Sequence, residues 1–223
     1  MRRRHFSDRG DRILDRNPVR VGRYRLFTRI NHWIIAASTI LLLLSGLAFY
    51  WPSLFWLTAL FGGGQAARWL HPILGLVLAV GYLLMFVQLV ARNIPRHDDV
   101  VWVRHIRDIV DQNEDKLPTL GKYNAGQKFV FWAMAGLILL LLGTGVMIWH
   151  QAFPDLVPVP ARRWAVLGHS VAAALMAMTF VLHVYAGIWT RGTLSAMTRG
   201  WVTGGWAWRH HRKWLKEVAG RRD

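Results

Sequence analysis

The chain has 223 residues, of which 53% are hydrophobic, and it carries 13 Trp, 10 His and a formal net charge of +16. It contains no cysteine, which excludes disulfides, thiolate metal sites and iron–sulfur clusters held by the chain itself. The positive charge lies in the segments that flank long apolar blocks, so it indicates membrane topology and contact with anionic lipid rather than nucleic-acid binding.

Four apolar blocks follow one another along the chain, and none of them contains Asp or Glu. A bilayer core about 30 Å thick is crossed by roughly 20 apolar residues of helix, and every block is at least that long. The first block is too long for a signal peptide and does not end in a small-residue cleavage site. The sequence therefore predicts an all-α integral membrane protein, a four-helix transmembrane bundle with helices at about 30–51, 69–91, 129–149 and 164–190.

Polar segments flank this transmembrane domain, which we place at residues 29–192. Residues 1–28 form a basic arm, for which we expect partial order against a partner. The first connection, "SLFWLTALFGGGQAARW", is apolar but contains three glycines, so we expect it at the membrane surface. In the middle loop, "DDVVWVRHIRDIVDQ" has apolar residues at helical spacing and predicts a short surface helix. Residues 193–223 form a basic tail rich in Trp, a mixture typical of anchors at a membrane interface.

The distribution of basic residues predicts the orientation. Of the 28 Lys and Arg, 25 lie before the first helix, between Arg92 and Lys128, or after Thr190. The other two connections contain only Arg68, Arg162 and Arg163. Since positive charge is retained on the cytoplasmic side, we expect both termini and the middle loop in the cytoplasm.

Four of the ten histidines fall inside the predicted membrane helices. A single membrane histidine is often a packing residue, but the positions of these four are related to one another. Helix direction places His32 and His183 toward the cytoplasmic side, and His71 and His169 toward the outer side. Each side of the membrane thus receives one histidine from the fourth helix and one from another helix.

The spacing on the fourth helix indicates what these pairs could hold. His169 and His183 are 14 residues apart, nearly four helical turns, so both rings project from one face and lie roughly 21 Å apart along the axis. Two b-type haems fit this arrangement, an outer one with its iron between His71 and His169 and an inner one between His32 and His183. Two axial imidazoles leave the iron no site for oxygen, which suits electron transfer. A proton relay or a metal transport path would usually recruit carboxylates as well.

Several segments resemble the cytochrome b (gamma) subunit of membrane-bound, quinone-linked formate dehydrogenases, over roughly residues 22–217. The segments that carry the resemblance are "RYRLFTRINHW", "HPILG", "LGKYNAGQK", "LGHSVAAALMAMTFVLHVYAGIW" and "RGWVTGGWAWRHHRKWLKE". The resemblance implies a non-catalytic subunit of an oxidoreductase in the bacterial inner membrane. It would hold two non-covalent haem b groups and pass electrons from an iron–sulfur (beta) subunit to a quinone. Formate would be oxidised at a molybdenum- or tungsten-pterin centre in an alpha subunit.

The resemblance also implies a quinone site next to the inner haem, at Asn124 and Gly126, with Gln127 and Lys128 adjacent. A carboxamide at Asn124 can hydrogen-bond a quinone carbonyl, and Gly126 has no side chain to block a ring. Asn is equally typical of the residue that caps the start of a helix, so "NAG" could simply begin the third helix.

Two alternatives remain open on the sequence. The chain could be the haem b subunit of a nickel–iron hydrogenase or of a sulfur-compound reductase. In a different class, it could be a haem-free membrane anchor or a metal-ion transporter.

Overall fold

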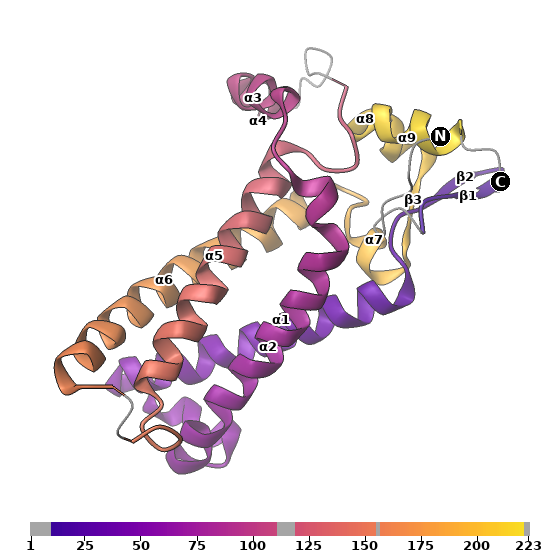
Figure 1. Ribbon diagram of the computed structural model, residues 1–223. Helices are drawn as coiled ribbons and strands as arrows, with labels where there is room; N and C mark the ends of the chain where they lie inside the picture. Colours follow the sequence, from indigo (N-terminus) through magenta and orange to yellow (C-terminus); the bar gives the residue numbers. More distant parts are fainter. Residues whose placement is uncertain (1–9, 111–118, 155–156, 221–223) are drawn as a thin grey trace. The chain divides into compact units, whose positions relative to one another are not determined.

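The computed structural model of the chain describes residues 10–110, 119–154 and 157–220. Four long helices dominate it (Figure 1), and each is long and apolar enough to cross a membrane. They confirm the four predicted spans and extend most of them by a few residues, because polar and small residues continue the helices beyond the apolar blocks. These helices are α1 (Leu26–Tyr50), α2 (Gly64–Asn93), α5 (Ala125–Ile148) and α6 (Val159–Trp189).

Shorter elements occupy the connections and both flanking segments. The first connection is largely a 3-10 helix. It ends where Gly62 and Gly63 adopt positive φ values of 87° and 102°, which residues other than glycine rarely adopt. In place of the single surface helix predicted in the middle loop, the structure has two short helices, α3 and α4, separated at His105; residues 111 and 112 of the predicted segment lie outside the described residues. The shorter elements are β1 (Ile13–Arg16), β2 (Val19–Gly22), η2 (Pro52–Phe61), α3 (His97–Arg104), α4 (Ile106–Val110), α7 (Leu194–Thr198), β3 (Trp201–Thr203), α8 (Gly204–His210) and α9 (Arg212–Ala219).

The chain divides into two compact units. We call residues 31–85 and 133–183 the helical unit, because they comprise η2 and most of the four long helices. The remaining described residues form the basic unit, which contains the ends of those helices, the middle loop, the arm and the tail. Only three of the 28 Lys and Arg, those of the two outer connections, belong to the helical unit. The other 25 lie in the residue ranges outside it, which gives the basic unit its name.

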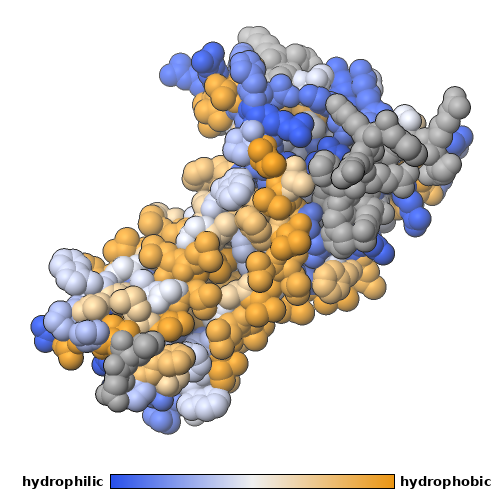
Figure 2. Space-filling model, viewed as in Figure 1, coloured by the Kyte–Doolittle hydropathy of each residue, from blue (hydrophilic) through white to orange (hydrophobic). Residues whose placement is uncertain are grey.

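Within the helical unit, α1 and α2 approach closely at Gly81. A Cβ atom at Gly81 would lie 3.1 Å from Cγ1 of Ile35, and Asn31 donates a hydrogen bond of 2.8 Å to the Gly81 carbonyl. A small residue lets two helix backbones pack together, and the amide supplies a polar contact where lipid offers none. Many large apolar side chains of this unit are exposed, among them Leu139 and Val80, and hydrophobic residues cover the visible face of the long helices (Figure 2).

The basic unit contains a three-stranded antiparallel sheet in the order β1-β2-β3. The N-terminal hairpin pairs with a strand of the C-terminal tail, with Val21 opposite Val202. Both valines are completely buried with Trp214 in a hydrophobic core that α8 and α9 complete. No pattern in the sequence predicts this sheet. The arm was expected to be partly ordered against a partner. Its residues 10–22 pack on the tail of the same chain, and its residues 1–9 lie outside the described residues.

A buried polar network adjoins this core. Lys122 donates to the Asp11 carboxylate at 2.7 Å, and both side chains are fully buried. Trp214 Nε1 donates to the other Asp11 oxygen at 2.9 Å. The Arg23 guanidinium lies 4.9 Å from the centroid of the Trp214 ring and donates to the Lys122 carbonyl. Trp214 therefore serves as a core residue and a hydrogen-bond donor, not as the interfacial anchor suggested by the composition of the tail.

Candidate functional site

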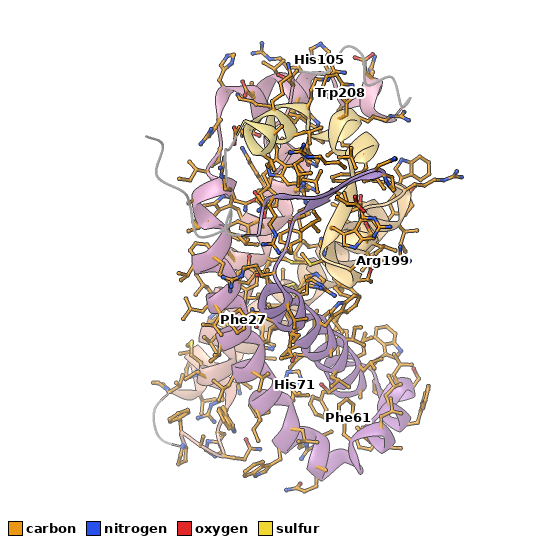
Figure 3. The ribbon with its side chains drawn as sticks, turned by 90° about the vertical axis from the view of Figure 1, so that its right-hand side faces the viewer. Phe27, Phe61, His71, His105, Arg199 and Trp208 are labelled. Atoms are coloured by element: carbon orange, nitrogen blue, oxygen red, sulfur yellow. The ribbon has the colours of Figure 1, made fainter. Side chains whose placement is uncertain are left out.

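The helical unit brings the four membrane histidines together as two pairs. The ring centroids of His32 and His183 are 6.1 Å apart, and those of His71 and His169 are 6.3 Å apart. The pairs join α1 to α6 and α2 to α6, as the helix directions predicted. Figure 3 labels His71 on α2, among the side chains of the long helices.

The spacing of both pairs fits an iron atom held between two imidazoles. A metal–nitrogen bond is about 2 Å, and a ring nitrogen lies roughly 1.1 Å from the ring centroid, so two imidazoles on opposite sides of one iron would place their centroids about 6.2 Å apart. The observed separations match this value closely. Two imidazoles alone do not complete a four-ligand zinc site, whereas they do complete the axial coordination of a haem.

Hydroxyl groups orient both rings of one pair. Ser45 Oγ lies 2.7 Å from His71 Nδ1, and Thr144 Oγ1 lies 2.9 Å from His169 Nδ1. Each hydroxyl also donates to a carbonyl one turn earlier in its own helix, at Leu41 and Leu140 respectively. A hydroxyl that donates to its own helix can accept from Nδ1–H, and this tautomer leaves the Nε2 lone pair of each ring for a metal.

Glycines give this pair its surroundings. A Cβ atom at Gly145 would lie 3.4 Å from Cε1 of His169, and one at Gly46 would lie 3.8 Å from Cε1 of His71. A Cβ atom added at Gly75, one turn after His71, or at Gly143, next to Thr144, would meet no described atom within 4 Å, and the same holds for Gly136, two turns earlier on α5. The absence of side chains at these positions suits the approach of a flat macrocycle to the helix backbones.

The other pair has different contacts. His32 makes an edge-on contact with the neighbouring Trp33 ring, with centroids 5.4 Å apart. Its Nδ1 is buried and has no hydrogen-bond partner among the described residues. The two pairs therefore have nearly the same spacing. They differ in that both Nδ1 atoms of the first pair lie beside a hydroxyl, whereas Nδ1 of His32 does not.

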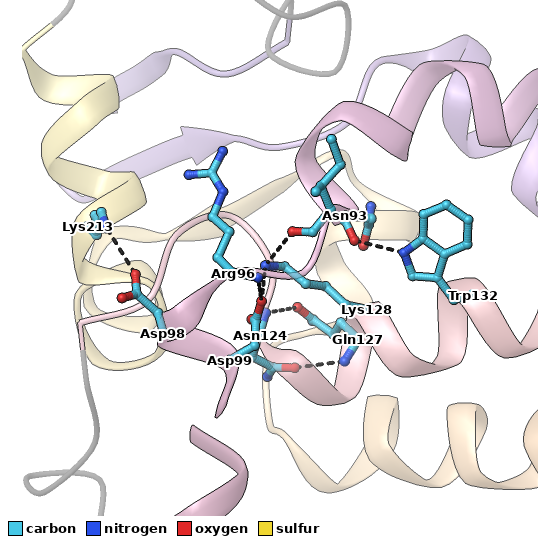
Figure 4. A network of polar contacts seen from close by, with 10 residues as sticks. Asn93, Arg96, Asp98, Asp99, Asn124, Gln127, Lys128, Trp132 and Lys213 are labelled. Carbon is cyan, nitrogen blue, oxygen red and sulfur yellow. Dashed lines mark hydrogen bonds and ion pairs between the residues drawn. The ribbon is translucent and has the colours of Figure 1, made fainter. Parts of the chain in front are cut away.

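The predicted quinone residues lie in the basic unit, where α5 begins. Asn124 Oδ1 accepts a hydrogen bond of 2.8 Å from the Gln127 backbone N–H, and Gln127 Oε1 accepts one of 3.1 Å from the Asn124 backbone N–H (Figure 4). This reciprocal arrangement is a capping box. The helix-capping role considered for Asn124 is therefore real, and its carboxamide oxygen is engaged.

Neighbouring contacts tie this cap to the middle loop. Lys128 Nζ donates to Asp99 Oδ2 at 2.7 Å and to the Ile94 carbonyl at 3.2 Å (Figure 4). A Cβ atom at Gly126 would lie 3.2 Å from the Trp102 ring of α3 and 3.5 Å from Asn124 Oδ1. The glycine thus accommodates an indole of the chain itself, and Trp102 and Asp99 join the cluster.

An exposed ion pair lies at the edge of the same region. Lys213 donates to Asp98 at 3.1 Å, and this hydrogen bond lowers the pKa of the Asp98 carboxyl, assisted by the charges of Lys213, His97 and Arg96. A pocket here is lined largely by charged groups, including Arg92, Arg96, Asp99, Lys122, Lys128 and Glu217.

Comparison with known proteins identifies the kind of molecule that carries these features. The sequence model of a family described as prokaryotic cytochrome b561 matches residues 23–200. The chain belongs to this family. The cytochrome is accordingly a multi-pass membrane protein that binds haem b, which removes the haem-free anchor and the metal-ion transporter from consideration.

Curated relatives of the cytochrome carry more specific names. It is 42% identical to "Formate dehydrogenase, cytochrome b556(fdo) subunit" of Escherichia coli K12 over 88% of the chain and 92% of that protein. It is 37% identical to "Formate dehydrogenase, nitrate-inducible, cytochrome b556(Fdn) subunit" of the same strain, over 88% and 90%. A "Formate dehydrogenase, cytochrome b556 subunit" of Haemophilus influenzae is 33% identical, over 90% and 84%.

Sequence reasoning missed four residues near the candidate sites: Ser45, Thr144, Trp102 and Asp99. A weak signal was available for the first two. In an antiparallel arrangement of helices, a hydroxyl 26 residues before His71 and one 25 residues before His169 can reach the same membrane depth as the ring. Trp102 and Asp99 belong to a short surface helix whose docking no local pattern reveals.

Proposed function

We propose that this cytochrome is the membrane subunit of a formate dehydrogenase complex, and that it carries electrons from an iron–sulfur subunit through two haem b groups to a membrane quinone. The observation that supports this most is that four membrane histidines form two pairs, with ring centroids 6.1 and 6.3 Å apart. The chain belongs to a cytochrome b family, and the relatives reported above are named as subunits of formate dehydrogenases. The chain itself would contain no formate site; a molybdenum- or tungsten-pterin subunit would oxidise formate.

His71 with His169, and His32 with His183, are the proposed axial ligands. When bound, haem supplies reversible one-electron chemistry between its ferrous and ferric states. The chain would contribute the ligands: each pair of imidazoles would hold one haem iron from two helices and leave no ligand position for oxygen. The absence of cysteine leaves the haems without covalent attachment.

The proposed orientation has both termini and the middle loop in the cytoplasm. It is supported by the 25 of 28 Lys and Arg in the arm, the middle loop and the tail. In this orientation His71 and His169 belong to the outer side of the membrane, where electrons would arrive from the iron–sulfur subunit. Quinone reduction would then take up protons from the cytoplasm, so electron transfer would separate charge across the membrane without a proton pump.

The proposed quinone site comprises Asn124, Gly126, Gln127 and Lys128. Because the Asn124 oxygen caps α5, its carboxamide nitrogen is the atom that would donate to a quinone carbonyl. The Lys128–Asp99 ion pair adds titratable groups to the same cluster, where a reduced quinone must be protonated. Trp102 lies against Gly126 and offers an aromatic face.

Purification of the intact complex tests the proposed assembly. We expect a pterin-containing subunit and an iron–sulfur subunit to co-purify with the cytochrome, and formate to reduce its haem bands. Co-purification with a hydrogenase or a sulfur-compound reductase, with haem bands that formate does not reduce, would contradict the proposal.

A substitution that separates capping from hydrogen-bond donation tests the quinone site. Asn124→Asp keeps a good helix cap but removes the NH₂ donor. Since a hydrogen bond to a charged group contributes about 1.5–3 kcal/mol, quinone reduction should slow by roughly tenfold or more. Formate oxidation with a dye that takes electrons from the partner subunits should stay unchanged, and so should haem content. Normal quinone reduction by Asn124→Asp would place the site elsewhere.

A further inference from the structure

The two hydroxyls beside His71 and His169 form the same polar chain on two different helices. Each chain runs from a backbone carbonyl through a hydroxyl to an imidazole nitrogen. On α1 the distances are 2.9 Å from Leu41 O to Ser45 Oγ and 2.7 Å on to His71 Nδ1. On α5 they are 2.6 Å from Leu140 O to Thr144 Oγ1 and 2.9 Å on to His169 Nδ1.

Coordination at Nε2 fixes the direction of both hydrogen bonds. An imidazole that binds iron through Nε2 carries its proton on Nδ1, so Nδ1 must be the donor. The hydroxyl suits this direction, because its single hydrogen can then go to a carbonyl of its own helix. A hydroxyl that donates in this way is polarised and becomes a better acceptor, so the two hydrogen bonds strengthen each other in a low-dielectric interior.

The pair of His32 and His183 lacks this feature at His32. The His32 Nδ1 is buried without a partner among the residues that the structure describes. The Thr39 hydroxyl, on the same helix as Ser45, bonds within that helix: Thr39 Oγ1 donates to the Ile35 carbonyl at 2.8 Å. The structure therefore equips one pair with two Nδ1 acceptors and leaves a ring of the other pair without one.

We propose that Ser45 and Thr144 are positioning residues that lower the reduction potential of the haem held by His71 and His169, relative to the haem held by His32 and His183. An acceptor at Nδ1–H increases the electron density that the imidazole gives to iron, which stabilises the ferric state. This inference rests on the proposed haem ligation. By it, two side chains that do not bind the metal would favour electron transfer in one direction.

The consequence is a downhill step in the proposed direction. An electron that arrives at the low-potential pair is passed to the pair with the higher potential, and the step exchanges one electron between two irons with no bond made or broken. The difference would drive electrons away from the iron–sulfur partner and toward the quinone.

Spectroelectrochemical titration of the purified complex tests this proposal, with the spectral component of each pair assigned from the one lost in His71→Ala. Removing one acceptor should shift the ferric–ferrous equilibrium of that haem by on the order of tenfold, the lower end of the effect of losing a hydrogen-bond partner of a metal ligand. A tenfold change is about 59 mV for a one-electron couple. Ser45→Ala and Thr144→Val should each raise the potential of the His71–His169 component and leave the other component in place. Ser45→Thr and Thr144→Ser, which keep the hydroxyl, should restore the wild-type potential.

The controls separate this proposal from the ligation on which it rests. Thr39→Val removes a hydroxyl from α1 that touches no histidine, so both potentials should stay at their wild-type values. A wild-type complex that binds two haems but shows no shift in Thr144→Val would overturn the proposal and leave the ligation standing. Equal shifts of both components, or a shift in Thr39→Val as large as that in Ser45→Ala, would overturn it too. A wild-type complex without two haems would overturn the ligation itself.

Discussion

In the basic unit, Val21, Val202 and Trp214 are completely buried among one another, whereas the helical unit has glycines, such as Gly75 one turn after His71, at which an added Cβ would meet no described atom within 4 Å. The first region has an interior that side chains of the chain itself fill. The second holds four imidazoles at the spacing of axial ligands and keeps side-chain bulk away from positions near them. We therefore expect side-chain packing to determine stability in the basic unit, and bound haem to contribute to it in the helical unit.

The largest effect on the basic unit should follow from breaking its buried ion pair. Asp11→Asn leaves the Lys122 ammonium buried without its carboxylate, and loss of one partner of a buried pair costs about 3–5 kcal/mol. The rate of proteolysis between residues 10 and 30 of the purified complex measures this cost, and haem content should not change. Asp98→Asn is the matched control, because the exposed Asp98–Lys213 pair contributes only about 0–1 kcal/mol. Equal proteolysis of both variants would show that the core does not depend on the buried pair.

Adding bulk in the helical unit should change haem content and leave proteolysis of the basic unit unchanged. Gly75 follows His71 by one turn and a Cβ there meets no described atom within 4 Å, so Gly75→Ala should be tolerated. Gly75→Leu should compete with the macrocycle and lower haem content from about two per chain toward one. Proteolysis of the basic unit should stay at the wild-type rate. Full haem content in Gly75→Leu would show that this glycine does not face a haem.

A single methyl group should matter more in the basic unit than in the helical unit. A Cβ atom at Gly22 would lie 2.5 Å from the Gly10 carbonyl oxygen, a contact between backbones that no rotamer can relieve. Gly22→Ala should therefore destabilise the basic unit by about 1–3 kcal/mol, the usual cost of overpacking. Proteolysis of the arm measures the change. Gly75→Ala is the comparison at an open position, and the same cost at both glycines would contradict the difference drawn between the two regions.

A smaller effect should appear in the pH dependence of the basic unit. Burial lowers the pKa of His211 well below its usual 6.5, aided by the nearby charge of Arg23, although the hydrogen bond to the Gly121 carbonyl opposes the shift. The folded unit keeps His211 neutral, while the unfolded chain binds a proton as the pH falls below about 6.5. Stability should therefore decline below that pH and be independent of this group above it. His211→Gln should flatten the decline, measured as proteolysis of the arm against pH; an unchanged slope would mean that other groups cause it.

The sequence predicted the parts of the fold that follow from membrane physics. Apolar length defines the four helices, and 14 residues between His169 and His183 place two rings on one face of α6. The sheet was missed because its strands are only three or four residues long, too short for a clear period, and because two of them lie in a segment that also resembles a basic arm. The role of Trp214 was missed because a Trp among Lys and Arg suits both a membrane interface and a buried site with a polar partner.

The candidate sites were predictable only as far as helix direction and residue spacing determine them. Histidine pairs could be deduced, because helix direction and spacing determine membrane depth. The contacts of Ser45 and Thr144 could not, since a hydroxyl in a membrane helix ordinarily bonds the preceding turn and its second contact depends on tertiary packing. At Asn124 the sequence left two roles open. The capping role is present, and the quinone role remains a prediction.

Haem content of paired histidine variants tests the central claim most directly, because it reports both the number of haems and the partners of each. Pyridine haemochrome analysis of the wild-type complex should give two non-covalent haem b groups per chain. His71→Ala with His169→Ala removes both ligands of one haem, so one should remain, whereas His71→Ala with His183→Ala removes one ligand of each, so none should remain. The account would be contradicted if the first double variant lost both haems while the second kept one, or if the wild-type chain held a single haem.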